Sequence, residues 1–242
     1  MPAGGTYLGV LVLTQSAEEN AFPRLASSLQ GGRIPDWKLE AVEERDSILA
    51  IRSDGVRLLL VAGVQLVTTE GLEVLGVAAS PEPCEKRPLE ETLELVRDAG
   101  GLPILAWGFG KWWGRRAKVV LEALRTEDPS GLFVSDSGVR PNLSTRPRLL
   151  QLSRKLGFRN LPGTDLFPVA GDEQRAGSFG SYVPMRLSSG TPLADLLDQL
   201  RSAGTDPKMY GRGLSCRRFL RFQASALWKK HAPEILKVAP FC

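Results

Sequence analysis

With 242 residues, the chain is long enough to bury the core of one large α/β domain or of two small domains. Its 43% hydrophobic and 24% charged residues are typical of a soluble globular protein, and no apolar run approaches the roughly 20 residues of a membrane-spanning helix. The single histidine, His231, excludes sites built from several imidazoles, and three widely spaced cysteines indicate a reducing, cytoplasmic location.

Apolar runs alternate along the chain with amphipathic stretches that end near glycine. In chain order we predict strand 7–14, helix 17–29, strand 37–44, helix 46–54, strands 56–69 and 71–78, helix 88–101, strand 102–108, helix 115–125, strand 131–138, helix 146–157 and strand 158–165. This alternation favours a parallel sheet, either open or closed into a barrel. Because no repeat or low-complexity linker is present, we predict one domain over residues 1–204 with a basic C-terminal extension over 205–242.

The net charge of +4 is concentrated in that extension. Residues 205–242 hold eight lysines and arginines against two acidic residues, so the extension carries +6 and the remainder of the chain −2. Because the basic character is not spread over the whole surface, nucleic acid is not an expected partner. The residue pattern of the extension predicts an amphipathic helix that packs on the domain. The alternative is that the extension makes peripheral contact with an anionic membrane or with an acidic protein partner.

The stretch "GGLPILAWGFGKWWGRR" at 100–116 places three of the five tryptophans within seven residues at a predicted strand end. In parallel α/β proteins this end of a strand carries the functional groups. One interpretation is that the aromatic rings fill the interior. The other is that Trp112 or Trp113 forms a stacking wall while Lys111, Arg115 and Arg116 bind phosphate near a helix N-terminus.

The loop "GTDLFPVAGDEQRAGSFGSYV" at 163–183 is rich in glycine and charge. It is interpreted either as a ligand loop or as a solvated loop in which Arg175 pairs with Asp165 or Asp172. A further alternative is a buried ion network of Arg45, Asp165 and Arg175.

Five segments are similar in order and context to those of one enzyme superfamily. They are "VAGVQLVTTEGLEVLGVA", "GGLPILAWGFGKW" and "LPGTDLFP", with weaker similarity in "VEERDS" and "LGVLVLT". Together they resemble the PHP (polymerase and histidinol phosphatase) superfamily over about residues 7–180. The resemblance implies a distorted TIM-like (β/α)7 barrel of the type that hydrolyses phosphoesters with bound metal ions.

The chain departs from that family at the positions that would bind metal. Of the ligands that the resemblance implies, only Asp165 is kept; the other positions hold Leu11, Leu13, Glu44, Arg45, Gln65, Trp107 and Phe167. Neutral amide, indole and phenyl groups cannot hold a cluster of divalent cations, and a guanidinium repels them. The sequence therefore predicts that metal-dependent phosphoester hydrolysis is lost, and it implies no metal site and no cofactor.

Two functions remain open. The first is a non-catalytic binding or scaffold protein for a phosphorylated or otherwise anionic small molecule or for a protein partner. The alternative is a phosphoesterase-type hydrolase with metal-independent or single-metal chemistry, using Asp165 with an arginine such as Arg45 or Arg175. The candidate ligand-binding residues are Arg45, Gln65, Trp107, Lys111, Trp112, Arg115, Asp165 and Arg175.

Overall fold

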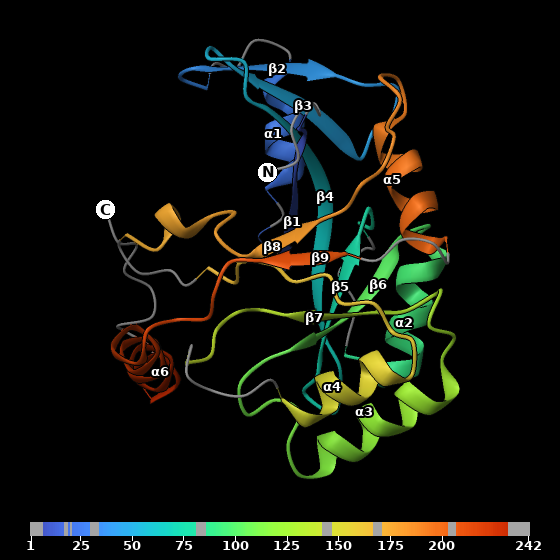
Figure 1. The fold of residues 1–242 in the computed structure, drawn as a ribbon, viewed down its shortest axis with the longest axis vertical. Helices are drawn as coiled ribbons and strands as arrows, with labels where there is room; N and C mark the ends of the chain where they lie inside the picture. Colours follow the sequence, from blue (N-terminus) through green and yellow to red (C-terminus); the bar gives the residue numbers. More distant parts are fainter. Residues whose placement is uncertain are drawn as a thin grey trace.

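The computed structural model describes residues 7–16, 19, 21–29, 34–80, 86–141, 147–166, 171–202 and 207–231, with side chains described to residue 224 of the last helix. Its centre is a seven-stranded mixed sheet (Figure 1). The strands are β1 (Gly9–Ser16), β2 (Trp37–Ala41), β3 (Ser47–Arg52), β4 (Arg57–Val67), β5 (Glu73–Val77), β6 (Leu102–Trp107) and β7 (Phe133–Asp136). They follow the order β2-β3-β4-β5-β6-β7, and β1 pairs with β4.

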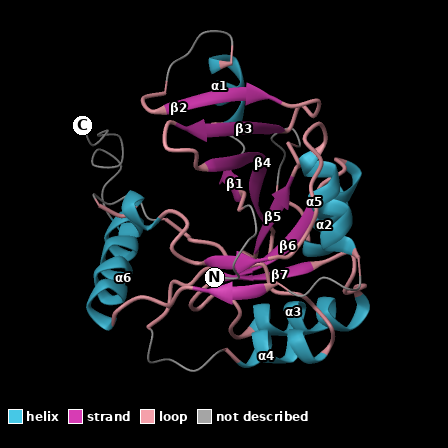
Figure 2. Cartoon of the chain, turned by 45° about the horizontal axis from the view of Figure 1, so that its top comes forward, coloured by secondary structure: helices cyan, strands magenta, loops and turns pink. Residues whose placement is uncertain are grey.

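The helices are α1 (Phe22–Ser28), α2 (Leu89–Asp98), α3 (Arg115–Thr126), α4 (Arg148–Lys155), α5 (Pro192–Arg201) and α6 (Cys216–His231), with a short 3-10 turn η1 (Glu173–Arg175). A small antiparallel pair, β8 (Gly180–Tyr182) and β9 (Lys208–Tyr210), joins the segment between α4 and α5 to the start of the basic extension. Figure 2 shows that α6 stands apart from helices α2 to α5. None of the helices among the described residues is long and apolar enough to cross a membrane.

The prediction of a TIM-like (β/α)7 barrel is wrong. Among the strands that the structure describes, β1–β4 and β6–β7 pair in parallel, whereas the other pairs in the large sheet are antiparallel and the sheet remains open. The connections at 42–46, 53–56 and 68–72 explain three of the four antiparallel pairs, whereas β5 and β6 are antiparallel across a longer connection that contains α2. A crossover between parallel strands needs a dozen or more residues, so the three short connections permit only antiparallel neighbours.

The segment 46–54, predicted as a helix, is part of the antiparallel sheet as β3. Its side chains alternate in the way that a strand requires, with Ile48 and Ala50 buried between β2 and β4. The predicted strand at 158–165 contributes one isolated bridge, between Val134 and Asn160, rather than a full strand. Most of the other predicted strands and helices are confirmed with shorter bounds, whereas β1 ends two residues beyond the predicted strand 7–14 and α3 ends one residue beyond the predicted helix 115–125. Helix α5 is additional.

Strand β4 organises the sheet. One edge of β4 pairs with β1 along most of its length, and its other edge pairs with β3 up to Val61 and with β5 from Gly63. Ala62 lies at the change of partner, because its amide donates to the carbonyl of Asp46 and its carbonyl accepts from Ala78. A Cβ at Gly63 would lie 3.0 Å from the carbonyl oxygen of Gly76, so the close approach at this point requires glycine.

The two faces of the sheet are covered by different helices. Helices α2, α3 and α4 pack on the face that carries Val74, Leu105 and Val134. Helix α5 packs on the opposite face against Val61, Ile104 and neighbouring side chains. A third cluster joins α1 to β3 and β4, and Leu11 and Leu13 of β1 pack against it. These two leucines, at positions that the family resemblance assigned to metal ligands, therefore contribute to packing.

The turn before β3 has a structural role in this fold. The carboxylate of Glu44 accepts hydrogen bonds from the amides of Leu193 (2.8 Å) and Ala194 (2.6 Å), in the first turn of α5. It also accepts from the hydroxyl of Ser47 at 3.0 Å. A carboxylate at this place satisfies amides that the helix leaves unpaired and interacts favourably with the helix dipole.

We expect Glu44→Ala to lower the free energy of unfolding by about 1–2 kcal/mol, because α5 loses this cap. Urea denaturation followed by circular dichroism measures the effect. Glu40→Ala is the matched control, because the ion pair of Glu40 with Lys38 is on the surface and is worth about 0–1 kcal/mol. Equal losses in both variants would contradict the capping role.

Candidate functional site

Several residues with polar, charged or aromatic side chains lie together at one end of the sheet. Strands β6 and β7 end at Trp107 and Asp136, which are opposite each other in register. The antiparallel strand β5 begins at the same end, with Glu73 opposite Ala106. Gln65, one of the predicted site residues, is half-buried opposite Leu75 and so shares the sheet face of Glu73. This end of the sheet is therefore the candidate site.

The two tryptophans predicted as ligand-binding residues are enclosed in the core. Trp107 is 4% exposed and Trp112 is 2% exposed, and both belong to the cluster beneath α2, α3 and α4. The indole nitrogen of Trp112 donates to the carbonyl oxygen of Ala106 at 3.0 Å. The structure thus gives the buried indole N–H a partner, as burial of tryptophan requires. Both rings stabilise the junction between β6 and α3.

A group of six charged side chains lies over the candidate site, and we call it the ion cluster: Glu73, Lys111, Asp165, Asp172, Arg175 and Arg218. Lys111 forms an ion pair with Glu73. The stem of Lys111 packs on Gly108, where a Cβ would lie 2.8 Å from the lysine Cδ. Because the cluster contains three carboxylates and three cations, its formal charges balance.

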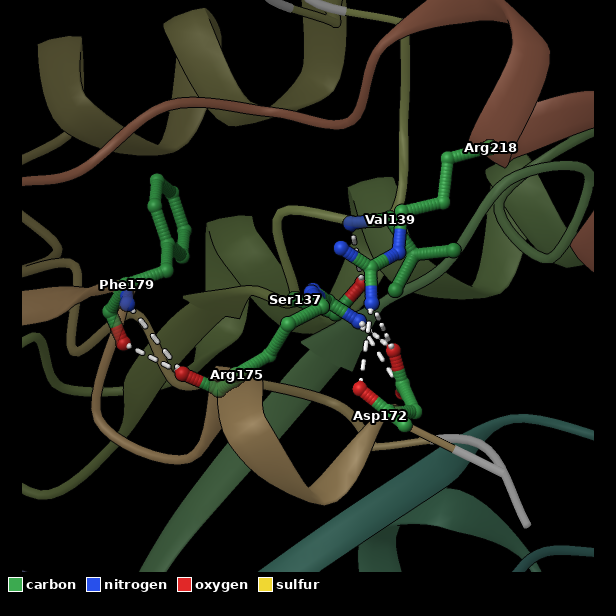
Figure 3. A network of polar contacts seen from close by, with 8 residues as sticks. Ser137, Val139, Asp172, Arg175, Phe179 and Arg218 are labelled. Atoms are coloured by element: carbon green, nitrogen blue, oxygen red, sulfur yellow. Dashed lines mark hydrogen bonds and ion pairs between the residues drawn. The ribbon is translucent and has the colours of Figure 1, made fainter. Parts of the chain in front are cut away.

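Asp172 is the centre of the ion cluster. Its side chain is completely buried, and both of its oxygens accept from Nη1 of Arg175 at 3.1 Å. Nη2 of Arg218, from α6, approaches Oδ1 at 3.3 Å and the carbonyl of Gly171 at 3.4 Å. Figure 3 shows the two arginines converging on this carboxylate.

The same two arginines flank an aromatic ring. The Cζ atom of Arg175 lies 5.6 Å from the ring centroid of Phe222, and the Cζ atom of Arg218 lies 5.8 Å from it. The Phe222 ring is itself buried. Asp172 therefore links the turn η1 to α6. Asp172 is one of the two partners that the sequence suggested for Arg175, the other being Asp165. Nothing in the local sequence pattern indicated that Arg218 also pairs with Asp172.

Asp165 lies beside the other members of the ion cluster. Asp165 is exposed as a residue, but nearby protein atoms still desolvate its carboxyl and raise its pKa above the ordinary value of 3.8. The negative charge of Glu73 raises this pKa further, while Lys111 and Arg175 act in the opposite direction. A carboxyl in this setting holds a proton more readily than a free aspartate and so could donate one to a bound group.

The raised pKa of Asp165 predicts the direction in which this residue changes the free energy of unfolding. Because folded Asp165 binds its proton more tightly than the unfolded chain does, its contribution opposes folding above pH 3.8 and disappears below it. We expect Asp165→Asn to be more stable than the natural protein at neutral pH, with a difference that shrinks to zero on acidification. Denaturation curves across this pH range measure it.

Asp54 supplies a control of opposite sign. Its hydrogen bond with Arg52 lowers its pKa to about 2, so Asp54 favours folding above the ordinary pKa and loses this contribution as the pH falls toward 2. Asp54→Asn should therefore be less stable than the natural protein at neutral pH. If Asp165→Asn behaved like Asp54→Asn, the environment inferred for Asp165 would be wrong.

Two other predicted residues lie on the surface, outside the ion cluster. The side chain of Arg45 is 94% exposed and approaches Asp46 at 3.5 Å. Arg45 therefore does not join Asp165 and Arg175 in a buried network. Arg115 is exposed at the first position of α3. Phe167 lies outside the residues that the structure describes.

A further ion pair, which no sequence pattern indicated, lies at this end of the sheet. Asp136 is completely buried, and its carboxylate accepts from Nη2 of Arg140 and from the amide of Gly138, both at 3.0 Å. These bonds close the loop that follows β7. Among the described residues, no group of three or more histidine, cysteine, aspartate or glutamate side chains is placed to hold a metal ion.

An exposed surface adjoins the ion cluster. Phe109 is 43% exposed, and its ring lies 5.1 Å from that of Trp113 and 5.0 Å from that of Phe219 in α6, in edge-to-face contacts. Trp113 is 59% exposed. The contact of Phe109 with Phe219 joins the loop before α3 to α6, and both helices carry further exposed residues. We call the exposed residues of these joined elements the aromatic–basic surface: Phe109, Trp113, Arg115, Arg217, Leu220 and Arg221.

Comparison with known proteins places the fold but not the family. No protein-family model matches the sequence, and no curated protein matches it. The structure is similar to that of PsfC from Pseudomonas syringae PB-5123, with a TM-score of 0.56 and 13% sequence identity over 90% of this chain and 81% of that chain. At this identity the likeness shows a shared fold alone.

Proposed function

We propose that this protein is a non-catalytic binding protein that recognises an anionic partner through the aromatic–basic surface. The observation that carries the proposal is a group of three aromatic rings in edge-to-face contact. Phe109 touches both Trp113 and Phe219, while Trp113 remains 59% exposed. Large aromatic side chains that cluster in contact with solvent are typical of interaction sites, and arginine is the charged residue most enriched there. The proposed location remains the cytoplasm.

The distribution of charge supports this surface over the ion cluster. Every cation of the ion cluster faces a carboxylate, so the cluster has no excess charge with which to attract an anion. In contrast, Arg115, Arg217 and Arg221 form no ion pair with any residue that the structure describes. Exposed, unpaired guanidinium groups are available to carboxylate or phosphate oxygens.

Binding assays with three anionic probes test the proposal: inorganic polyphosphate, a fluorescent hexaglutamate peptide, and vesicles that contain phosphatidylglycerol. We expect at least one probe to bind, with an affinity that falls as salt is added, because the contacts are between exposed charges. Trp113→Ala and the double variant Arg217→Gln/Arg221→Gln should each weaken binding by at least about ten-fold, the effect of 1.4 kcal/mol.

Arg125→Gln is the control for loss of one positive charge, because Arg125 is exposed at the opposite end of α3 from Trp113. It should bind as the natural protein does. The proposal fails if none of the three probes binds, or if the variants of the aromatic–basic surface bind every probe as tightly as the control.

A second candidate function is acid–base hydrolysis of a phosphate monoester without a metal cluster. The raised pKa of Asp165 and its place beside the Lys111–Glu73 ion pair favour it, because a protonated carboxyl could donate its proton to the leaving oxygen as a water molecule attacks the phosphorus atom. Turnover of p-nitrophenyl phosphate that is lost in Asp165→Asn and retained in Trp113→Ala would select this function over the first.

A further inference from the structure

We infer that the anionic partner is a lipid bilayer, and that the aromatic–basic surface lies against a membrane rich in anionic headgroups. The inference rests on the proposed function and names its partner. It is carried by the exposed aliphatic, aromatic and arginine side chains on α6 and on the β6–α3 loop, two elements that the contact between Phe109 and Phe219 joins.

Helix α6 has two different sides in its described part. Phe219 and Phe222 are buried, 7% and 1% exposed, and fasten the helix to Val139 and Leu214 of the protein body. The outward side carries Arg217, Leu220, Arg221 and Ala224, which are exposed at the three- and four-residue spacing of one helix face. The helix is thus held by apolar contacts on one side and leaves a further apolar residue, Leu220, in solvent.

Leu220 is the most exposed large hydrophobic residue among those described, at 65%, and arginines lie three positions before it and one after it. A surface that covers Leu220 must offer an apolar layer directly beside negative charge. The boundary between lipid headgroups and acyl chains has this structure, and basic amphipathic helices lie in it with their apolar residues inserted.

The β6–α3 loop adds an aromatic anchor next to this helix. Phe109 contacts both Phe219 of α6 and Trp113, so its ring links the exposed Trp113 to this helix. Tryptophan is enriched at the headgroup level of membranes, where its amphipathic ring is favourable. Arg115, two residues after Trp113, and the arginines of α6 supply positive charge that complements anionic lipids.

Soluble anions complement only part of this surface. Polyphosphate or a nucleic acid would neutralise the arginines and could contact the rings, but it would leave Leu220 in water. A hydrophilic acidic peptide has the same shortcoming. A bilayer offers an apolar layer for the aliphatic and aromatic groups and anionic headgroups for the basic ones, and the net charge of +6 over residues 205–242 favours the same partner.

Vesicle flotation of the full chain tests the inference, with vesicles of phosphatidylcholine alone or with about 30% phosphatidylglycerol, near the physiological ionic strength at which the Debye length is about 8 Å. We expect flotation with the anionic vesicles and not with phosphatidylcholine alone. Each of Arg217→Gln and Arg221→Gln should lower the partition coefficient about five-fold, the equivalent of the attraction of one basic residue to such a surface. Leu220→Ala and Trp113→Ala should lower it as well.

Two measurements separate membrane insertion from general charge attraction. Brominated lipid should quench the fluorescence of the bound protein, and Trp113→Phe should remove a distinct part of that quenching. Leu156→Ala is the control for loss of an exposed leucine, since Leu156 is 40% exposed at the end of α4, and it should float as the natural protein does. Thermal melting of every variant establishes that it is folded.

The outcomes discriminate the two proposals. Binding to polyphosphate or hexaglutamate through Trp113 and the arginines, without flotation, would overturn the lipid inference and leave the proposed function intact. Flotation that is unchanged by Leu220→Ala and Trp113→Ala would also overturn the inference, because other residues would then be responsible. If neither the soluble anions nor the vesicles bind, both the inference and the proposed function are wrong.

Discussion

Replacing Asp172 by asparagine is expected to lower the free energy of unfolding by about 3–5 kcal/mol, the cost of leaving a buried charge without its partner. The side chain of Asp172 is 0% exposed, and that of Arg175 is 10% exposed, so the guanidinium of Arg175 cannot exchange its lost partner for bulk water. Urea denaturation followed by circular dichroism measures this loss.

Arg218 provides the comparison within the same cluster. Its side chain is 42% exposed, so in Arg218→Gln the remaining Asp172–Arg175 pair stays intact, and we expect a loss of no more than about 1 kcal/mol. The double replacement Asp172→Leu with Arg175→Met removes both buried charges together and should recover much of the stability. A loss in Asp172→Asn as small as that in Arg218→Gln would show that the carboxylate does not hold this end of the molecule together.

Replacing Trp107 by alanine is expected to cost about 3–5 kcal/mol of unfolding free energy, the usual result of removing a large aromatic side chain from a core. Trp107 is 4% exposed at the end of β6 and packs among side chains beneath α2, α3 and α4. The cavity left behind cannot be refilled without moving these helices. Chemical denaturation of the variant tests the effect.

Trp113→Ala is the matched control, because it removes the same side chain six positions further along the chain. Trp113 is 59% exposed, and surface substitutions of this kind usually change stability by no more than about 0.5 kcal/mol. The two variants therefore separate the structural tryptophan from the one proposed to bind. Similar losses of unfolding free energy in both variants would mean that Trp113 stabilises the fold rather than forming part of an interaction surface.

The ion cluster and the aromatic–basic surface have different consequences for function. In the ion cluster, each cation is held by a carboxylate, which gives the cluster a stabilising role and keeps α6 against the turn η1. In the aromatic–basic surface, the arginines are exposed and the rings face solvent. A predicted site residue can therefore be charged and near a strand end, as Arg175 is, without being available to a ligand.

Local patterns in the sequence located most of the secondary structure correctly. Apolar periodicity identified β4, β6 and helices α2 to α4, because the spacing of apolar side chains directly reflects which face of an element is buried. The same patterns failed for Ser47–Arg52, where a short apolar run fits both a helix and a strand. Its pairing with β2 on one side and β4 on the other makes it a strand.

The sequence predicted only some of the ion pairs at the candidate site. The spacing of Asp172 and Arg175 within one loop made their ion pair one of the foreseeable alternatives, and the structure contains it. Arg218 lies on a helix far along the chain, and its approach to Asp172 depends on how α6 docks against Val139 and Leu214. No local pattern encodes such a contact.

The amino-acid sequence alone established the positions of most helices and strands, the concentration of positive charge toward one end, and the presence of an aromatic block at the end of β6. Only the tertiary structure decided that the sheet is open and largely antiparallel, that Trp107 and Trp112 are buried, and that Trp113 faces solvent. The reason is physical: periodicity reports a local preference, whereas strand pairing and the burial of one ring among several depend on chain connections and contacts between segments distant in sequence.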